Sequence, residues 1–581
     1  MLFAQTIVKQ RTGVEELTYA VPAQIVPYLK MGSLVTVPLR RRQVRAIVVG
    51  LRKTVSKELR PKIKSIVSIE RTQGLSDAQI RVIRRLAIYY AASLAEVAFH
   101  ALGGQATLGL SRPAQAVGKP VFLQADWEDR TSEYVKLIAK HPRKSFLLLF
   151  AQASYAEAFA VLARKLRLEV VFDDGKAATR KTLESLQAAS TPFVLIATIQ
   201  KAFYPLSPGD VIVIDQPNHV GAKQQQRPFM RTQTIGRVRA QEEALQLIVG
   251  DSLPGVTDVL RFVRDQWQLK SRPYQVKPLT IFNRKGSRSL LVEGLQREIA
   301  DRLQKKERLL ILVMARGWAP ALVCTECGHI FECQQCGRTT SLERGELVCR
   351  YCHHRDPRPT QCSVCGSELL HEVGEGVTKV VAELRQSFPG VSVQEVSGDQ
   401  PHYRPSTQLT VATEKIFSWP ALSVDTAIFL SVDRLLTAAQ LNNTSELLAY
   451  LLYFQRRART VLVQTYFPDH YIWGIAGQTR IKEFFQRELS LRKRYHLPPY
   501  SQLFSVVGQV HSVEALHRQL PQLIDTVLAH LKDAQIGEVQ IEPVANQQRA
   551  RFSVLTSQLT DKQKLTLRDA LPPAWHLDIE P

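Results

Sequence analysis

All eight cysteines of the chain lie within residues 324–365, where they form four C-x-x-C pairs. Two C-x-x-C turns together supply the four thiolates of a tetrahedral zinc site, so four turns predict two zinc ions. We expect a nested arrangement, in which the outer pairs meet and the inner pairs meet across a 12-residue hairpin. The ligands are then Cys324, Cys327, Cys362 and Cys365 for one zinc ion, and Cys333, Cys336, Cys349 and Cys352 for the other.

Other arrangements of these cysteines stay open. Sequential pairing would confine residues 324–336 to one very tight knuckle. Disulfides are rare in the cytoplasm, where a chain without a signal-peptide core is expected to remain, and one iron–sulfur cluster would leave four cysteines unused. A closed four-cysteine site has no open coordination position, so it is expected to act as a folding staple that can also present a surface.

The composition points to a large soluble protein with an acidic partner. The 581 residues are 45% hydrophobic and 22% charged, which is typical of about four globular domains, and no apolar run reaches the ~18 residues of a membrane helix. The net charge is +23, and residues 1–110 carry 17 Lys or Arg against 6 Asp or Glu. Nucleic acid is the partner that this charge favours.

Four arginines near the N-terminus are candidate contacts for DNA phosphates. They lie between two strand-like runs, on an expected turn or edge, and they are Arg40, Arg41, Arg42 and Arg45. A solvated strand edge that resists aggregation is the alternative interpretation. A single helical stretch is expected to follow over residues 75–102.

The elements beyond residue 135 alternate between strand and helix, which predicts two parallel sheets covered by helices. The expected strands of the first sheet are residues 145–150, 168–172, 193–198, 211–215 and 245–250. Those of the second are residues 309–314, 392–397, 409–413, 426–431 and 460–466. Two such lobes beside a basic domain suggest a nucleic-acid motor, which needs a nucleotide site.

The residues of that nucleotide site are largely missing. No G-x-x-x-x-G-K-[ST] loop exists, and residues 119–174 contain no glycine, although glycines let backbone N–H groups surround phosphates. Asp215 ends a strand where a motor keeps a metal-binding Asp, but Gln216 follows it instead of a Glu that activates water. Asp215 is thus a candidate remnant of a degenerate nucleotide site, with a plain turn cap as the alternative, and no catalytic residue is proposed.

Several motifs resemble primosomal protein N-prime, the PriA family of replication-restart helicases. MLFAQTIV and LTYAVP resemble its N-terminal domain, VIVIDQPNHVGAKQQQ its D-E-E-H region, ARGWAPALVCTECG the entry to its two-zinc insertion, and VLVQTYFPDHYIW its C-terminal part. The resemblance implies binding of DNA and of primosome proteins. The family also uses the nested cysteine pairing.

The departures from the family fall mainly on its ATP site. D-E-E-H is replaced by Asp215, Gln216, Pro217 and Asn218, and the late arginine box reads LYFQRRAR. This box keeps Arg456 and Arg459, which with Arg457 are implied as DNA contacts, while Thr18 replaces the Asp of the 3-prime-end pocket. Just before the cysteine-rich segment 324–365, Arg316 and Trp318 could contact single-stranded DNA by charge and stacking. A buried Trp318 is the alternative.

The expected fold class is α/β, with two RecA-like helicase lobes, an eight-cysteine insertion with two zinc ions in the second lobe, a β-rich N-terminal domain and a small α+β C-terminal domain. The expected parts are an N-terminal DNA-binding domain (1–108), a linker (109–135), lobe 1 (136–275), lobe 2 (276–323 and 370–500), the zinc insertion (324–369) and the C-terminal domain (501–581).

The function expected from these features is that of a PriA-like protein. It would bind forked or single-stranded DNA in replication restart and primosome assembly, in the cytoplasm and without ATPase or helicase activity. One alternative is an active 3-prime to 5-prime helicase with an unorthodox nucleotide site, and another is a zinc-ribbon module that binds RNA or protein. The expected cofactors are two Zn²⁺ ions, and the sequence leaves ATP binding open.

Overall fold

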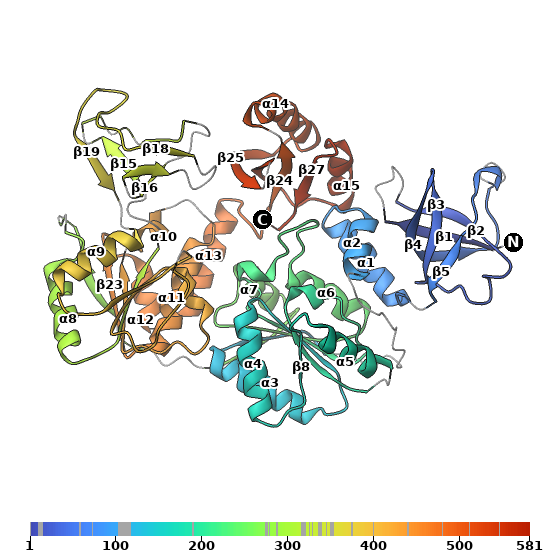
Figure 1. Cartoon of the computed structure of the whole chain (residues 1–581), viewed down its shortest axis with the longest axis horizontal. Helices are drawn as coiled ribbons and strands as arrows, with labels where there is room; N and C mark the ends of the chain where they lie inside the picture. Colours follow the sequence, from blue (N-terminus) through green and yellow to red (C-terminus); the bar gives the residue numbers. More distant parts are fainter. Residues whose placement is uncertain are drawn as a thin grey trace.

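The computed structural model shows separate sheets joined into one elongated arrangement (Figure 1). It describes residues 2–9, 15–56, 60–72, 74–102, 118–188, 191–272, 277, 279–285, 287, 289–314, 321–324, 326–327, 329, 331–334, 340–343, 345–348, 354–373, 376–398, 400–430, 432–437, 441–478, 480–510, 512–544 and 547–580. In this described part of the chain no helix has the length and apolar character needed to cross a membrane.

The N-terminal domain is an antiparallel sheet followed by two helices. Its strands pair in the order β2-β1-β4-β3-β5, with bounds β1 Leu2–Val8, β2 Leu17–Val21, β3 Leu34–Leu39, β4 Arg42–Arg52 and β5 Ser68–Arg71. The expected single helix over 75–102 is two helices, α1 Asp77–Tyr89 and α2 Leu94–Leu102. The break falls where Ala91 takes a φ of 48°, which a continuous right-handed helix cannot contain.

Lobe 1 is a parallel sheet with strand order β12-β6-β11-β10-β7-β9-β8. The strands are β6 Val121–Gln124, β7 Phe146–Phe150, β8 Val171–Phe172, β9 Val194–Ala197, β10 Val211–Asp215, β11 Gln246–Asp251 and β12 Gln268–Ser271. Its helices are α3 Trp127–Lys140, α4 Ala153–Lys165, α5 Ala177–Ala188, α6 Thr232–Glu242 and α7 Val256–Val263. The central strands are continuous apolar runs because helices cover both faces of the sheet.

The expected linker over residues 109–135 is wrong in its second half. Strand β6 pairs with β11 and β12, and α3 begins at Trp127, so residues 121–135 belong to lobe 1. A strand of four residues is too short to produce a clear periodic pattern, which is why the sequence did not reveal it.

Lobe 2 is a second parallel sheet, with strand order β13-β23-β22-β14-β21-β20. Its strands are β13 Leu279–Asn283, β14 Leu309–Val313, β20 Val393–Val396, β21 Leu409–Ala412, β22 Thr426–Leu430 and β23 Thr460–Thr465. Its helices are α8 Glu293–Gln304, α9 Val377–Ser387, α10 Asp433–Thr437, α11 Asn443–Arg457, α12 Tyr471–Gln478 and α13 Ile481–Arg494.

The cysteine-rich insertion stands between β14 and α9, apart from the lobe 2 sheet (Figure 1). It contains the pair β15 Ala321–Cys324 and β19 Leu370–Val373, and a small sheet of β16 Ser341–Glu343, β17 Glu346–Val348 and β18 Arg355–Pro357.

The C-terminal domain is an antiparallel sheet in the order β25-β26-β24-β27, covered by two helices. The bounds are β24 Gln502–Val510, α14 Val513–His530, β25 Gln535–Val544, β26 Gln547–Thr556, α15 Asp561–Ala570 and β27 Trp575–Asp578.

One apolar core joins three of these parts. Buried residues of α1 and α2, of one face of the lobe 1 sheet and of the C-terminal domain form a single cluster, which includes Leu86, Leu147, Ile235 and Phe552. A polar junction lies at its edge, where Glu580 accepts hydrogen bonds from Tyr89 at 3.0 Å, Thr234 at 2.8 Å and Tyr90. The N-terminal helices and the C-terminal domain are therefore built onto lobe 1.

Candidate functional site

Asp215 lies at the carboxyl end of β10, level with Phe150 of β7 and Gly250 of β11. Its carboxylate is fully buried and accepts three side-chain hydrogen bonds. Arg130 donates two of them, from Nε to Oδ2 at 2.8 Å and from Nη2 to Oδ1 at 2.9 Å. The Tyr134 hydroxyl donates the third, to Oδ2 at 2.9 Å. The group expected as a remnant metal ligand is thus occupied by an arginine and a tyrosine.

Helix α3 supplies both partners of Asp215. The Asp126 side chain caps the helix by accepting from the Asp129 backbone N–H at 3.0 Å, and Arg130 and Tyr134 follow on the buried face. Burial alone would lower the pKa of Arg130, but the charge and hydrogen bonds of Asp215 raise it overall. Burial and Asp215 also raise the pKa of Tyr134. Both groups therefore stay protonated and keep donating to the carboxylate.

The sequence prediction included neither Arg130 nor Tyr134. A signal for them exists in α3, whose buried residues Trp127, Arg130, Thr131, Tyr134 and Ile138 follow helical spacing. An arginine on the apolar face of a helix requires a buried acceptor. Asp215 at the end of an apolar strand is one candidate for it.

Aromatic side chains fill the turn between β7 and α4, which contains no glycine. Tyr155 is 1% exposed, and its ring meets Trp127 edge-on with centroids 4.7 Å apart. Trp127 also contacts Phe150 at the end of β7. The loop after β10 covers this turn closely, since a Cβ on Gly221 would lie 2.1 Å from the Ala151 carbonyl oxygen. The turn is consequently packed against protein on both sides.

The late arginines of lobe 2 divide into two groups. Arg456, whose side chain is 16% exposed, forms an ion pair with Asp126 of lobe 1, and Arg457 lies 3.4 Å from Glu128 of the same helix. Arg459 is 82% exposed and lies 3.7 Å from Asp425. Only Arg459 of these three offers most of its side chain to solvent.

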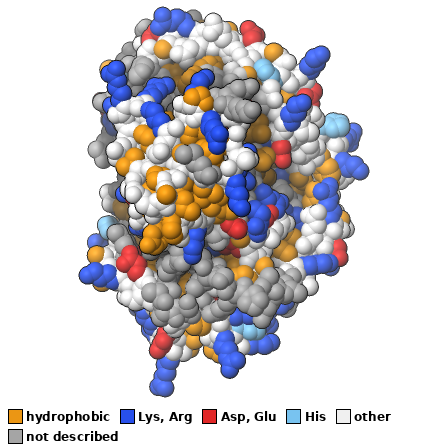
Figure 2. All heavy atoms as spheres, turned by 90° about the vertical axis from the view of Figure 1, so that its right-hand side faces the viewer, with side chains coloured by type: hydrophobic (Ala, Val, Ile, Leu, Met, Phe, Trp, Pro, Cys, Tyr) orange, Lys and Arg blue, Asp and Glu red, His pale blue; other side chains and the backbone are white. Residues whose placement is uncertain are grey.

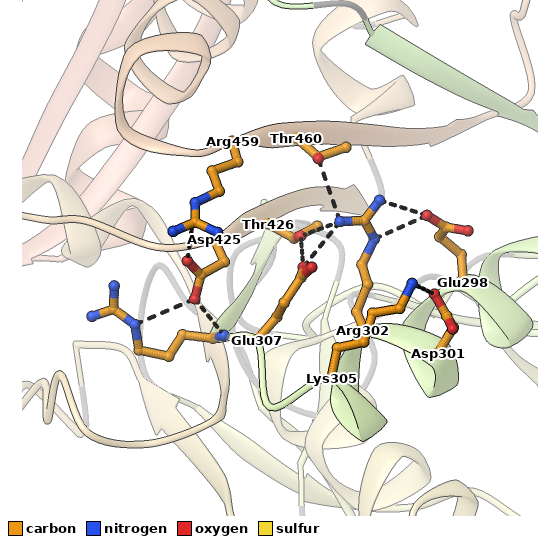
Figure 3. A network of polar contacts seen from close by, with 10 residues as sticks. Glu298, Asp301, Arg302, Lys305, Glu307, Asp425, Thr426, Arg459 and Thr460 are labelled. Carbon is orange, nitrogen blue, oxygen red and sulfur yellow. Dashed lines mark hydrogen bonds and ion pairs between the residues drawn. The ribbon is translucent and has the colours of Figure 1, made fainter.

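The neighbourhood of Arg459 is a network of charges at the beginning of β22 and β23 (Figure 3). Arg302 is enclosed there, with Glu298 at 2.6 Å, Glu307 at 3.0 Å and the Thr426 hydroxyl at 2.9 Å. Arg302 therefore serves the lobe 2 structure, whereas Arg459 projects from the same edge.

The four outer cysteines come together in the insertion. The ligand atoms of Cys324, Cys327, Cys362 and Cys365 all lie within 4.8 Å of one another. Two sulfur pairs, Cys324 with Cys365 and Cys327 with Cys362, are each 3.6 Å apart. Zinc–sulfur bonds of ~2.3 Å in a tetrahedron place sulfurs ~3.8 Å apart, so the donors and their spacing fit such an ion.

Neighbouring groups shift the pKa values of the thiols in both directions. Backbone N–H groups of Cys327 and Glu326 and the neighbouring thiols lower the pKa of Cys324 to about 7, while the neighbouring thiols and burial raise the pKa of Cys365 to about 12. Of the inner set, Cys333 is buried, while Cys336, Cys349 and Cys352 lie outside the described residues. Arg316 and Trp318 lie outside the described residues as well.

The N-terminal arginines form the tip of a hairpin. Leu39 pairs with Arg42, which leaves Arg40 and Arg41 as a two-residue turn, with Arg40 at a φ of 54°. All four candidate arginines are exposed, although Arg45 forms an ion pair with Glu70 at 2.8 Å. The hairpin tip is therefore free of the sheet's own packing and accessible to a large ligand.

The face of the molecule on the N-terminal side combines apolar and basic side chains. Figure 2 shows an apolar patch on this face with Lys and Arg around it. Exposed apolar residues of the domain include Tyr28 at 63%, Val67 at 45% and Val26 at 39%. Such a mixture suits single-stranded nucleic acid, whose bases stack on aromatic rings such as that of Tyr28 while its phosphates meet cations.

Comparison with known families identifies the N-terminal part. Residues 8–103 match the family model described as the 3'DNA-binding domain (3'BD) of PriA. This match shows a domain similar to the 3'DNA-binding domain of PriA, and two parallel-sheet lobes follow it. The chain resembles proteins named replication restart protein PriA, as its motifs predict.

The curated relatives differ in how much of the chain they match. The protein of Bacillus subtilis is 23% identical over 337 residues, covering 51% of this chain and 41% of the relative. That of Rickettsia felis is 22% identical over 558 residues, covering 84% and 85%. In its matches to the first relatives, the chain spans about half their length, from 41% to 49%.

Solved structures give a remote likeness. The Escherichia coli DExH-box NTPase HrpB is 12% identical, with 60% of this chain and 39% of HrpB covered and a TM-score of 0.34. Saccharomyces cerevisiae Dbp5 bound to RNA and ADP BeF3 is 10% identical, with 72% and 97% covered and a TM-score of 0.32.

Proposed function

We propose that the protein binds forked or single-stranded DNA as a PriA-like factor in replication restart and primosome assembly, and that it does so without hydrolysing ATP. The observation that carries the proposal is the buried carboxylate of Asp215, which Arg130 and Tyr134 occupy. A metal ion at Asp215 would have to displace Arg130 and leave its buried guanidinium without the Asp215 carboxylate, which is strongly unfavourable.

The sequence motifs on which phosphoryl transfer usually depends are missing after β7 and β10. Catalysis of that reaction is mostly positioning and electrostatic stabilisation by a phosphate loop, its lysine and a held metal ion. The glycine-free turn after β7 packs Tyr155 and Trp127 against each other instead of leaving backbone N–H groups around a phosphate. The occupied Asp215 and the packed turn after β7 affect different parts of ATP hydrolysis. Together they favour a protein that no longer hydrolyses ATP.

Binding of DNA rests on independent features. The match to a PriA 3'DNA-binding domain, the net charge of +23 and the exposed arginine hairpin all favour an anionic partner. We assign the cassette two structural Zn²⁺ ions, one held by the outer cysteines that lie together and one by the inner cysteines. These sites would shape the insertion without taking part in a reaction.

An ATPase assay with forked DNA tests the absence of turnover. We expect no hydrolysis above background, with or without DNA, and no heat of nucleotide binding in calorimetry. DNA-stimulated hydrolysis that disappears in a folded Asp215→Asn variant would overturn the proposal. Circular dichroism of the variant establishes that it is folded.

A DNA-binding assay tests the partner. Forked DNA should bind more tightly than duplex DNA or RNA of equal length, and Arg40→Ala/Arg41→Ala should weaken binding and flatten its salt dependence by about two units of log–log slope. A matched variant, Lys140→Ala/Arg143→Ala, removes two exposed charges from lobe 1 and should leave affinity nearly unchanged. Tighter binding to RNA, or a flat salt response, contradicts the proposal.

A further inference from the structure

The end of helix α11 in lobe 2 contacts the beginning of helix α3 in lobe 1 through opposite charges. Arg456 forms an ion pair with Asp126, and its Nη1 lies 3.6 Å from Asp129. Arg457 Nη2 lies 3.4 Å from both carboxylate oxygens of Glu128. Arg456 and Asp126 are 16% and 12% exposed, so solvent screens their attraction only weakly, whereas Glu128, the partner of the buried Arg457, is 61% exposed.

Aromatic contacts extend this interface into the turn after β7. The guanidinium of Arg457 stacks on the ring of Tyr453, 4.1 Å from its centroid. Burial and the neighbouring Tyr155 of lobe 1 raise the pKa of the Tyr453 hydroxyl, so the two side chains lie close together. Burial also raises the pKa of Tyr155, while the nearby guanidinium of Arg457 lowers it. The lobe 2 side chains therefore reach the degenerate nucleotide site itself.

An apolar contact ties the lobes together at a second place. Leu253 and Val256 follow strand β11 of lobe 1, yet they belong to the buried core of lobe 2, and they are 6% and 4% exposed. Helix α7 packs against α13 of lobe 2 over the same region. Moving the lobes apart would expose this apolar surface as well as the buried charges.

A motor of two lobes needs a cleft whose contacts change with its ligand. A ligand shifts a conformational equilibrium only by as much as its affinity differs between the two states. Here the groups that meet across the cleft belong to the chain itself. Asp215 is held by Arg130 and Tyr134, and Arg456 and Arg457 each face a carboxylate of lobe 1, although Arg457 Nε is buried without a hydrogen bond among the described residues.

We propose that the α3–α11 contact, made by Asp126, Glu128, Tyr453, Arg456 and Arg457, is a permanent clamp that holds the two lobes in one closed arrangement. The clamp replaces the bound nucleotide of a working motor, and it keeps the DNA-binding parts in fixed relation. This proposal rests on the proposed loss of ATP hydrolysis, but it concerns the motion of the two lobes.

Distance measurement between the lobes tests the clamp. Spin labels on non-natural amino acids at Glu157 of α4 and Gln386 of α9, both exposed, report the separation by electron–electron resonance without touching the cysteines. We expect one narrow distance distribution that neither Mg-ATP nor forked DNA changes. A wild-type distribution that shifts with nucleotide overturns the clamp.

Charge reversal supplies the matched comparison. Arg456→Glu/Arg457→Glu should broaden the distribution at least twofold, and adding Asp126→Arg/Glu128→Arg should narrow it again. Arg459→Glu, two residues beyond the clamp and 82% exposed, should leave it unchanged. If the double reversal in a protein with native circular dichroism keeps the wild-type distribution, the clamp is wrong.

The same samples separate this inference from the proposed function. If the lobes move when nucleotide is added but the protein hydrolyses no ATP, the clamp proposal is wrong and the proposed function stands. DNA-stimulated hydrolysis would remove the proposed function, and fixed distances in the presence of ATP would still support the clamp.

Discussion

Arg130 and Asp215 form a buried ion pair that is satisfied on nearly every side. Arg130 also donates from Nη1 to the Ala125 carbonyl oxygen at 2.7 Å, so all three of its nitrogens are engaged. Two buried charges are expensive to desolvate, and the loss is recovered only when geometry is good and other hydrogen bonds are made. Removing one partner of such a pair typically destabilises a protein by about 3–5 kcal/mol. The pair is thus hard to open for a ligand.

Asp251, at the end of β11, should make stability depend on pH. Burial raises its pKa to about 7, while the nearby Arg130 lowers it and Asp215 raises it. Between about pH 4 and pH 7 the folded state then binds more protons than the unfolded chain, so the free energy of unfolding falls as pH rises. Asp251→Asn should therefore stabilise the protein more at pH 8 than at pH 5, by about 2–3 kcal/mol. Urea unfolding at both pH values measures this difference.

The control for Asp251 is an exposed carboxylate. Asp265→Asn changes a side chain that is 86% exposed and should leave the free energy of unfolding nearly unchanged. An equal effect of Asp251→Asn at pH 5 and pH 8 contradicts the assigned pKa.

Residue identity alone could predict part of the site. The C-x-x-C spacing predicts which cysteines meet, because each turn fixes two thiols locally, and the four outer sulfurs do lie together. Arg130 is separated from Asp215 by 85 positions, and their contact depends on how α3 docks onto the sheet. Docking is a property of the folded lobe, so no local pattern specifies that pair.

In the cysteine-rich insertion, short strands position the cysteines that would hold a metal ion. Cys324 ends β15 and pairs with Leu370 of β19, which brings the first C-x-x-C turn beside the fourth, Cys362 and Cys365. Strand β15 has only four residues and buries little apolar surface. The small core of the insertion includes Leu322 of this strand and Phe331. A domain with so small a core generally needs a metal to be stable.

Cys365→Ser should therefore remove one metal ion and loosen the β15–β19 pair. We expect zinc content to fall from two equivalents to one, measured by atomic emission on the purified protein. Ser363→Ala, in the same turn, removes only a 3.3 Å hydrogen bond to His329 and should keep both ions. Unchanged zinc in Cys365→Ser would show that the outer cysteines do not hold a metal.

Long apolar strands could be predicted, and short elements could not. The runs expected over 145–150 and 211–215 correspond to β7 and β10, whose residues are all buried. The run expected over 168–172 contributes only Val171 and Phe172, because an edge strand needs few paired residues. Strand β6 was missed for the same reason of length.

The molecule as a whole is organised around lobe 1. The N-terminal helices and the C-terminal domain share its core, and polar contacts reinforce the arrangement. Lys223 donates to both Asp578 carboxylate oxygens at 2.8 and 2.7 Å, and Arg568 forms an ion pair with Glu15 at 3.0 Å. Parts that share one core are expected to unfold together.

Loss of the Glu580 side chain should be the first change to separate the N-terminal helices, lobe 1 and the C-terminal domain. Glu580→Ala leaves the hydroxyls of Tyr89 and Tyr90 without their acceptor, and each unsatisfied buried donor costs about 1–3 kcal/mol. We expect faster hydrogen exchange in α1 and α6, measured by mass spectrometry. Glu580→Gln keeps one acceptor oxygen and should show a smaller effect, and the exposed Lys562→Ala should show none. Exchange that rises equally in all three variants contradicts this role.

The contact between α3 and α11 also bears on when such a protein could act. Occupancy of a nucleotide cleft follows the ratio of ATP to ADP, which falls when a cell starves. The groups of Arg456, Arg457, Asp126 and Glu128 are tethered to one chain, so their effective concentration is constant. Lobes held by these groups would keep the same arrangement in growing and in starved cells, and DNA binding would be independent of the energy supply.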